Sequence, residues 1–129
     1  MKRIIKIQWQ RLLQQGETCP RCSSTEQELN DALTILKPIL NQQHIEIVLE
    51  KKTITPAEFH QNPQASNLIL INHRPLESYL GAKTGTSPCC DVCGTEQCRT
   101  VELNNRIYET IPAEIIVQAV LNAVTEIKD

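Results

Sequence analysis

The sequence has few aromatic residues, little charge imbalance and no long apolar segment. Only Trp9, Phe59, Tyr79 and Tyr108 are aromatic, and 15 acidic side chains stand against 13 basic ones. The net charge of −2 includes no basic stripe, so the phosphate contacts that nucleic-acid binding needs are missing. The longest apolar run, residues 68–71, falls far short of the roughly 20 residues of a membrane span. We therefore expect a soluble protein that binds neither nucleic acid nor membrane.

The amino-terminal residues also lack the features of an export signal. Residues 1–6 are basic, but their apolar side chains alternate with polar ones and no small-residue cleavage site follows. A chain of 129 residues has the length of one domain and can bury roughly two thirds of its unfolded surface. We expect a single cytoplasmic domain over residues 1–129 that folds without needing disulfide bonds.

Cysteine is too sparse here for a disulfide scaffold. The six cysteines make up about 5% of the chain, below the roughly 8–10% typical of disulfide-rich secreted chains. In a reducing compartment, such thiols are more often redox-active or metal-bound than joined in structural disulfides. The cysteines are therefore the residues that say most about function.

The hydrophobic pattern predicts a β-α-β unit at the start of the chain. Residues 3–10 and residues 45–50 alternate apolar and polar side chains with the period of a strand. Between them, helix-start signals over residues 23–28 precede one apolar helical stripe over residues 29–40. Pro38 should kink or end the last turn of this helix. The two strands should be parallel, with a right-handed crossover.

Two further strands and a short helix are expected next. The polar connection over residues 51–66 contains a possible short helix over residues 57–60. Residues 68–71 are apolar throughout, as in a central strand covered on both faces. Residues 76–80 alternate well enough to return antiparallel as a fourth strand.

The last part of the chain predicts an insertion, a hairpin and a closing helix. Residues 81–100 hold glycines, a proline and four cysteines with almost nothing for a core, so we expect a Cys-rich inserted loop. Residues 101–103 and 106–108 flank an Asn-Asn pair suited to a tight hairpin turn. Pro112 is suited to the first residue of a helix whose apolar face includes residues 115–127.

Cys19-Pro20-Arg21-Cys22 is the sharpest chemical motif. It precedes the first helix, where unpaired backbone N–H groups and the positive end of the helix dipole favour a thiolate, and Arg21 adds a positive charge. The motif therefore predicts Cys19 as an attacking thiolate and Cys22 as the resolving thiol of a redox pair. Half of a zinc site, or a reduced pair without function, is the alternative.

A second cysteine cluster, formed by Cys89, Cys90, Cys93 and Cys98, falls in the insertion. The spacing of Cys90 and Cys93 lets both sulfur atoms reach one tetrahedral ion, and Cys98 can complete the set with Cys89 or a thiol from elsewhere. Thiolates suit zinc or a softer ion such as mercury or arsenite. The alternative is a Cys90–Cys93 or Cys89–Cys98 disulfide that clamps the loop. The spacing matches neither common ferredoxin order of an iron–sulfur cluster.

The expected strand order gathers both cysteine motifs at one end of the sheet. If residues 68–71 and 76–80 run antiparallel to residues 3–10, the first strand ends where the third begins and the fourth ends. Cys19, the insertion and the 51–66 connection then lie on one side. We expect a thiol of the insertion within about 10–15 Å of Cys19, close enough for loop motion to permit a thiol relay or a shared metal site.

Other polar residues near these motifs are weaker candidates. His60 can accept a proton from Cys22 or bind a metal, although a loop histidine is more often only solvated. Arg11, Arg21 and Arg99 can steady thiolates or an anionic substrate, although surface charge is their more ordinary role.

Six short motifs along the chain can be compared with known families: Trp9-Gln10-Arg11-Leu12, Thr18-Cys19-Pro20-Arg21-Cys22, Ser66-Asn67, Cys90-Asp91-Val92-Cys93-Gly94, Cys98-Arg99-Thr100 and Tyr108-Glu109-Thr110-Ile111-Pro112. With these motifs, the chain resembles an uncharacterised prokaryotic thioredoxin-like family over nearly its whole length. The resemblance implies an α/β thioredoxin-like fold with a mixed central sheet. It implies little about activity, because a fold does not settle chemistry.

One departure from thioredoxins bears on the expected chemistry. Thioredoxins carry a cis-proline just before the third strand, facing the dithiol, whereas this chain has Ala65-Ser66-Asn67 there. Without this proline, the usual thioredoxin-like docking of a substrate peptide beside the dithiol is not expected. The missing proline also leaves that face more open to soft metals.

Two functions are compatible with these motifs. The first is a thiol–disulfide oxidoreductase or redox carrier that acts on a protein disulfide or a small thiol through Cys19 and Cys22 and requires no cofactor. The alternative is a protein that binds zinc or a thiophilic metal or metalloid ion through Cys89, Cys90, Cys93 and Cys98.

Overall fold

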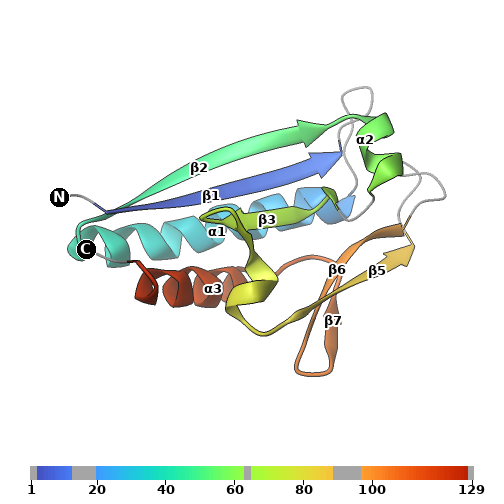
Figure 1. The fold of residues 1–129 in the computed structure, drawn as a ribbon. Helices are drawn as coiled ribbons and strands as arrows, with labels where there is room; N and C mark the ends of the chain where they lie inside the picture. Colours follow the sequence, from blue (N-terminus) through green and yellow to red (C-terminus); the bar gives the residue numbers. More distant parts are fainter. Residues whose placement is uncertain (1–2, 13–19, 63–64, 89–96, 128–129) are drawn as a thin grey trace.

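Two helices cover one face of a four-stranded mixed sheet in this α/β protein (Figure 1). The computed structural model describes residues 3–12, 20–62, 65–88 and 97–127. In the β-α-β unit, β1 (Arg3–Leu12) leads to α1 (Pro20–Gln42), which returns to β2 (Ile45–Ile54). β1 and β2 pair in parallel along their whole lengths, from Arg3 opposite Ile45 to Leu12 opposite Ile54. The predicted β-α-β unit is confirmed.

The sheet continues on the other side of β1. β3 (Leu68–Ile71) runs antiparallel to β1, with Leu68 opposite Gln10, and a two-residue β4 (Arg74–Pro75) pairs with β3. The strand order is therefore β2-β1-β3-β4. The short helix α2 (Pro56–Gln61) in the connection before β3 is confirmed, and the mixed sheet and carboxy-terminal helix are as expected.

The core lies between this sheet and the helices α1 and α3 (Ala113–Thr125). The period of two in β1 and the period of 3.6 in the helices turn one face of each element inward. The inward side chains of these elements are buried: Ile5, Ile7, Trp9, Leu12, Leu29, Ala32, Leu33, Leu36, Leu40, Ile115, Ile116, Ala119, Val120 and Ala123. α1 continues past Pro38 to Gln42, so the proline does not end the helix. Leu40, which lies beyond the proline, is buried with the other apolar residues of the helix.

The opposite face of the sheet is open among the described residues. α1 and α3 lie on the same side of the sheet (Figure 1). Ile69 and Ile71 are buried, whereas Leu68 and Leu70 are only half-buried. The expectation of a strand covered on both faces is therefore wrong. β3 is thus apolar throughout and occupies an inner position of the sheet, although helices cover only one face of that sheet.

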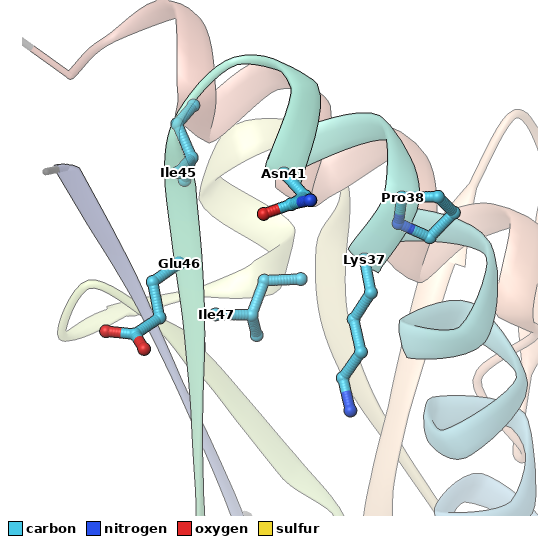
Figure 2. Close-up of a pocket in the computed structure, with 6 residues that line it drawn as sticks. All are labelled: Lys37, Pro38, Asn41, Ile45, Glu46 and Ile47. Carbon is cyan, nitrogen blue, oxygen red and sulfur yellow. The ribbon is translucent and has the colours of Figure 1, made fainter.

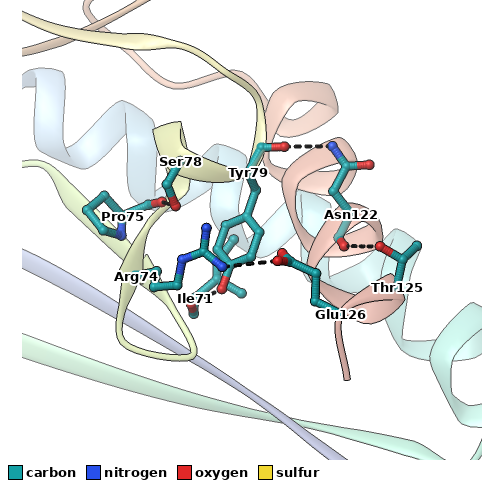
Figure 3. A network of polar contacts seen from close by, with 8 residues as sticks. All are labelled: Ile71, Arg74, Pro75, Ser78, Tyr79, Asn122, Thr125 and Glu126. Atoms are coloured by element: carbon teal, nitrogen blue, oxygen red, sulfur yellow. Dashed lines mark hydrogen bonds and ion pairs between the residues drawn. The ribbon is translucent and has the colours of Figure 1, made fainter. Parts of the chain in front are cut away.

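The expected fourth strand over residues 76–80 is also wrong. Leu76–Tyr79 form a short 3-10 helix, η2, and β4 is the Arg74–Pro75 pair before it. Proline has no N–H to donate to a strand ladder. The 3-10 turn also lets the Tyr79 hydroxyl donate to the Ile71 carbonyl at 2.7 Å and the Ser78 hydroxyl donate to the Pro75 carbonyl at 2.7 Å (Figure 3).

Residues 81–100 contain strands where the sequence predicted a loop, and residues 89–96 of that segment lie outside the described residues. β5 (Lys83–Pro88) and β6 (Gln97–Leu103) pair antiparallel, and β7 (Arg106–Tyr108) completes a three-stranded sheet. The hairpin between β6 and β7 is confirmed, with its two turn asparagines at positive φ. α3 begins one residue later than expected, because Pro112 is its extended N-cap.

Candidate functional site

The structure describes the backbone of two of the six cysteines. Cys22 lies in the first turn of α1, and Cys98 lies in β6 opposite Ser87. Cys19, Cys89, Cys90 and Cys93 lie outside the described residues. Within the described part of the chain, no three His, Cys, Asp or Glu side chains form a group suited to a metal ion. The redox pair and the metal-ligand set therefore stay predictions.

The elements that flank both cysteine motifs meet at one end of the structure. β3 begins beside the end of β1, because Leu68 pairs with Gln10. Figure 1 shows β5 ending, and β6 beginning, on the side of the molecule where α1 begins. The antiparallel direction expected for β3 against β1 is confirmed. The sequence predicts a strand over residues 76–80 that leads the chain back to this end. In the structure, β5, which follows η2, does so instead.

The turn before β3 is tied to the end of β1. The Leu12 N–H donates to the Ser66 hydroxyl at 3.0 Å, and the Gln10 side-chain amide donates to the Ala65 carbonyl at 2.8 Å. Ser66 and Asn67 are buried. The described residues contain no cis peptide bond, and Asn67 has a φ of 59°. Side-chain hydrogen bonds therefore hold this turn.

The segment that leads into α3 joins this turn to the first turns of α1. The Asn67 side-chain amide donates to the Glu109 carbonyl at 3.0 Å, and the Ile111 N–H donates to the Thr25 hydroxyl at 3.2 Å. Thr25 is fully buried and comes three residues after Cys22. Three of the motifs quoted above thus form one hydrogen-bonded frame around the start of α1. Sequence reasoning missed this frame, because Ser, Thr and Asn in turns carry no sign of their distant partners.

A buried ion pair holds the strand that contains Cys98. The guanidinium of Arg99, the next residue, lies 2.7 Å from the Glu77 carboxylate, and the Thr84 hydroxyl donates to the same oxygen at 2.9 Å. The side chains of Arg99 and Glu77 are only 8% and 6% exposed. Because Glu77 balances its charge, Arg99 anchors β6 to η2. Glu77 gave no signal in the sequence, since its segment resembled a strand.

Several buried polar atoms at this end have no hydrogen-bond partner within the described residues. They include Nε and Nη1 of Arg11, Nε1 of Trp9, Oδ1 of Asn67 and Oγ1 of Thr100. Arg11 Cζ stacks 4.5 Å from the centroid of the Trp9 ring, which fixes the guanidinium at the end of β1. Unpartnered buried polar groups are uncommon in proteins and are often found at functional sites. Arg11 therefore stays a candidate for an anion or thiolate contact.

His60 lies in the last turn of α2 and is exposed. α2 follows directly from β2, because Thr55 caps it and forms a reciprocal capping box with Glu58. The hydrogen bond from the Thr55 backbone N–H to the Glu58 carboxylate is the main reason that the pKa of Glu58 lies below its usual value. α2 is thus anchored at the same end of the sheet as the start of β3.

Known proteins are similar to this chain over most of its length, including the elements described above. A family model matches residues 5–120, which extend from β1 into α3 and include both cysteine motifs. The chain belongs to the family described as Domain of unknown function (DUF2703). This DUF2703 chain is 44% identical over 112 residues to an uncharacterized protein of Archaeoglobus fulgidus, a match that covers 87% of this chain and 82% of that protein. No solved structure matches it.

The matched region of the DUF2703 chain contains every residue of the hydrogen-bonded frame and the Arg99–Glu77 pair. None of the described helices is long and apolar enough to cross a membrane.

Proposed function

We propose that this DUF2703 protein has a thioredoxin-like fold and acts in the cytoplasm as a thiol–disulfide oxidoreductase or redox carrier. The observation that carries the proposal is the start of α1 at Pro20, inside the Cys19-Pro20-Arg21-Cys22 motif. A cysteine just before a helix is close to unpaired backbone N–H groups and the positive end of the helix dipole, which favour a thiolate. The parallel β1-α1-β2 unit gives the motif the context expected of such a dithiol.

The reaction proceeds by two thiol–disulfide exchanges. The Cys19 thiolate attacks one sulfur of a substrate disulfide, and the other sulfur leaves as a thiolate that takes up a proton. Cys22 then loses its proton and attacks the Cys19 sulfur, so the substrate is released as a dithiol and a Cys19–Cys22 disulfide forms. A small-thiol reductant, consumed as its own disulfide, returns the pair to the dithiol.

The frame around α1 supports this role by fixing the helix start. Thr25, Ser66 and Asn67 are buried and bonded, so the turn before β3 and the first turns of α1 keep a constant relation. A dithiol that must pass through defined exchange geometries benefits from such a rigid support. Because Ser66 and Asn67 replace a cis-proline here, we expect substrates that need little backbone pairing beside the dithiol, such as exposed disulfides and small disulfide molecules.

Insulin reduction with a chemical reductant tests this proposal. We expect wild-type protein to accelerate the reaction, Cys19→Ser to abolish the acceleration, and Cys22→Ser to reduce it strongly. A variant with Ser at 89, 90, 93 and 98 is the matched control and should keep most of the activity. Equal rates for wild type and Cys19→Ser would refute the proposal.

A second candidate function is binding of zinc or a thiophilic ion by Cys89, Cys90, Cys93 and Cys98. The pairing of Pro88 with Gln97 favours it, because the chain leaves β5 and re-enters β6 at adjacent points. Cysteines on a segment with adjacent ends are suited to one tetrahedral ion. Metal analysis of anaerobically purified protein, with thiol titration before and after chelation, tests it. A metal-free protein with six titratable thiols and no affinity for zinc or soft ions would exclude this function.

A further inference from the structure

β2 is a long strand with one unpaired edge. It has ten residues and, within the described structure, pairs only with β1 (Figure 1). Glu46, Val48 and residues 50–53 are exposed along it, and the Val48 side chain is 40% exposed. The unpaired N–H and C=O groups of an edge strand form a template for another strand.

Apolar surface lies beside this edge on the side of the helices. A pocket of about 380 Å³ opens between the end of α1 and the start of β2, and Lys37, Pro38, Asn41 and Ile47 are among its lining residues. Figure 2 shows Ile47 pointing from β2 toward α1, whereas Glu46 points away from it. Ile47 and the next inward residue, Leu49, are only half-buried. A strand added to this edge therefore gains apolar contact as well as hydrogen bonds.

We propose that a second copy of this chain pairs with β2 in antiparallel fashion, in the register that places Leu49 opposite the partner's Leu49. A two-fold axis perpendicular to the sheet keeps each side chain on its own face, so the register must be centred on a residue. In this register Glu46 lies opposite the partner's Lys52, and Lys52 lies opposite the partner's Glu46. Two opposite-charge pairs thus form on the open face of a continuous sheet.

The neighbouring registers are disfavoured by charge. A register centred on Val48 places Glu46 opposite the partner's Glu50, whereas one centred on Glu50 or Lys51 places that residue opposite its own copy. Like charges directly opposite each other destabilise a strand pair. In the register centred on Leu49, no like charges lie opposite each other. Val48 faces the partner's Glu50, which can keep its ion pair with Lys6, 3.3 Å long in the single chain.

The remaining contacts of this register are also compatible. Ile47 lies opposite the partner's Lys51, whose alkyl stem can cover the isoleucine while its ammonium group keeps its ion pair with Glu26, which is 2.8 Å long in the single chain. Lysine on an edge strand commonly discourages pairing. Here the placement of glutamate and lysine six residues apart makes the same charges complementary across a two-fold axis.

Sedimentation equilibrium of the full chain, with a non-thiol reductant to prevent disulfide-linked dimers, tests the proposal. We expect a reversible dimer, with Glu46→Lys and Lys52→Glu each raising its dissociation constant about tenfold by placing like charges opposite each other. The double variant E46K/K52E restores opposite charges and should recover most of the wild-type affinity. Glu114→Lys, on the exposed surface of α3, is the control for net charge and should dimerise as wild type does.

Each other outcome contradicts the proposal. A monomeric wild type rules out self-pairing, and a dimer that is insensitive to both single variants lies on another surface. A double variant as weak as the single ones excludes the register centred on Leu49. Circular dichroism confirms that each variant is folded, and insulin reduction by the same variants keeps this test separate from that of the redox function.

Discussion

Arg99 and Glu77 form a buried ion pair. Its contribution to stability depends on the cost of burying either charge without its partner. Taking a carboxylate and a guanidinium out of water is costly, and their contact and the Thr84 hydroxyl help to offset that cost. The pair therefore adds little net stability over an apolar pair of the same size. Its main effect is to fix β6, and with it the backbone of Cys98, against η2.

Removal of one partner is predicted to be far more harmful than removal of both. Glu77→Gln leaves the Arg99 charge buried and unbalanced, so it should lower the free energy of unfolding by about 3–5 kcal/mol. The double variant E77L/R99M removes both charges and should recover most of this loss. Urea denaturation monitored by circular dichroism measures the free energy of unfolding of the wild type, of the single variants Glu77→Leu and Arg99→Met, and of the double variant. A double variant whose loss of stability equals the sum of the losses in Glu77→Leu and Arg99→Met would show that the two residues act independently.

At the scale of the elements, η2 is fixed through Tyr79 and Arg74 (Figure 3). The Tyr79 hydroxyl donates to the Ile71 carbonyl of β3, and the Tyr79 carbonyl accepts from the Asn122 side chain of α3 at 2.8 Å. Arg74 stacks 4.6 Å from the centroid of the tyrosine ring and pairs with Glu126 at 3.1 Å. One aromatic residue thus links η2, the sheet and the last helix.

Burial raises the pKa of Tyr79 above its usual value of 10.0. The folded protein therefore favours the neutral phenol, and this contribution to stability is fully present below the unfolded pKa and is lost as the pH rises through the folded pKa. Tyr79→Phe removes the hydrogen bond to Ile71 and should cost about 0.5–1.5 kcal/mol at neutral pH. Thermal unfolding between neutral and alkaline pH compares the two proteins. The wild-type advantage should shrink as the tyrosine ionises, and an advantage that grows with pH would contradict this assignment.

The elements that the sequence predicted are those with a strong hydrophobic period. β1, α1 and α3 each show one buried stripe because their apolar residues recur with the period of their secondary structure. β5 and the start of β6 gave no such signal, since β5 consists mostly of Thr, Gly and Ser, and β6 begins with polar residues and a cysteine. β-branched threonine favours strands, and that was the one available hint.

The candidate site was predictable only in its topology. The strand order implied that β3 begins beside the end of β1, and the pairing of Leu68 with Gln10 agrees. The bonds from Leu12 to Ser66 and from Ile111 to Thr25 join residues far apart in the sequence, so no local pattern reveals them. The same holds for the partner of Arg99.

At the scale of the whole molecule, β1 ends and β6 begins on the same side of the structure. This arrangement predicts that thiols of the two cysteine motifs can exchange. Mild oxidation of Cys22→Ser should trap Cys19 in a disulfide with a cysteine of residues 89–98, identified by peptide mass analysis. The triple variant that also lacks Cys90 and Cys93 is a control for the choice of partner. If Cys19 forms disulfides only between molecules or with added thiols, the relay between the motifs does not operate.

The central claim, that Cys19 and Cys22 form a redox pair, is tested most directly by equilibration of the wild-type protein with glutathione buffers of graded potential. Peptide mapping after acid quenching then reports the oxidation state of each cysteine. We predict that Cys19 and Cys22 convert together and reversibly between a dithiol and an intramolecular disulfide, in one two-electron transition. Cysteines 19 and 22 that stay reduced over the whole range, or that pair with other cysteines instead of each other, would contradict the account.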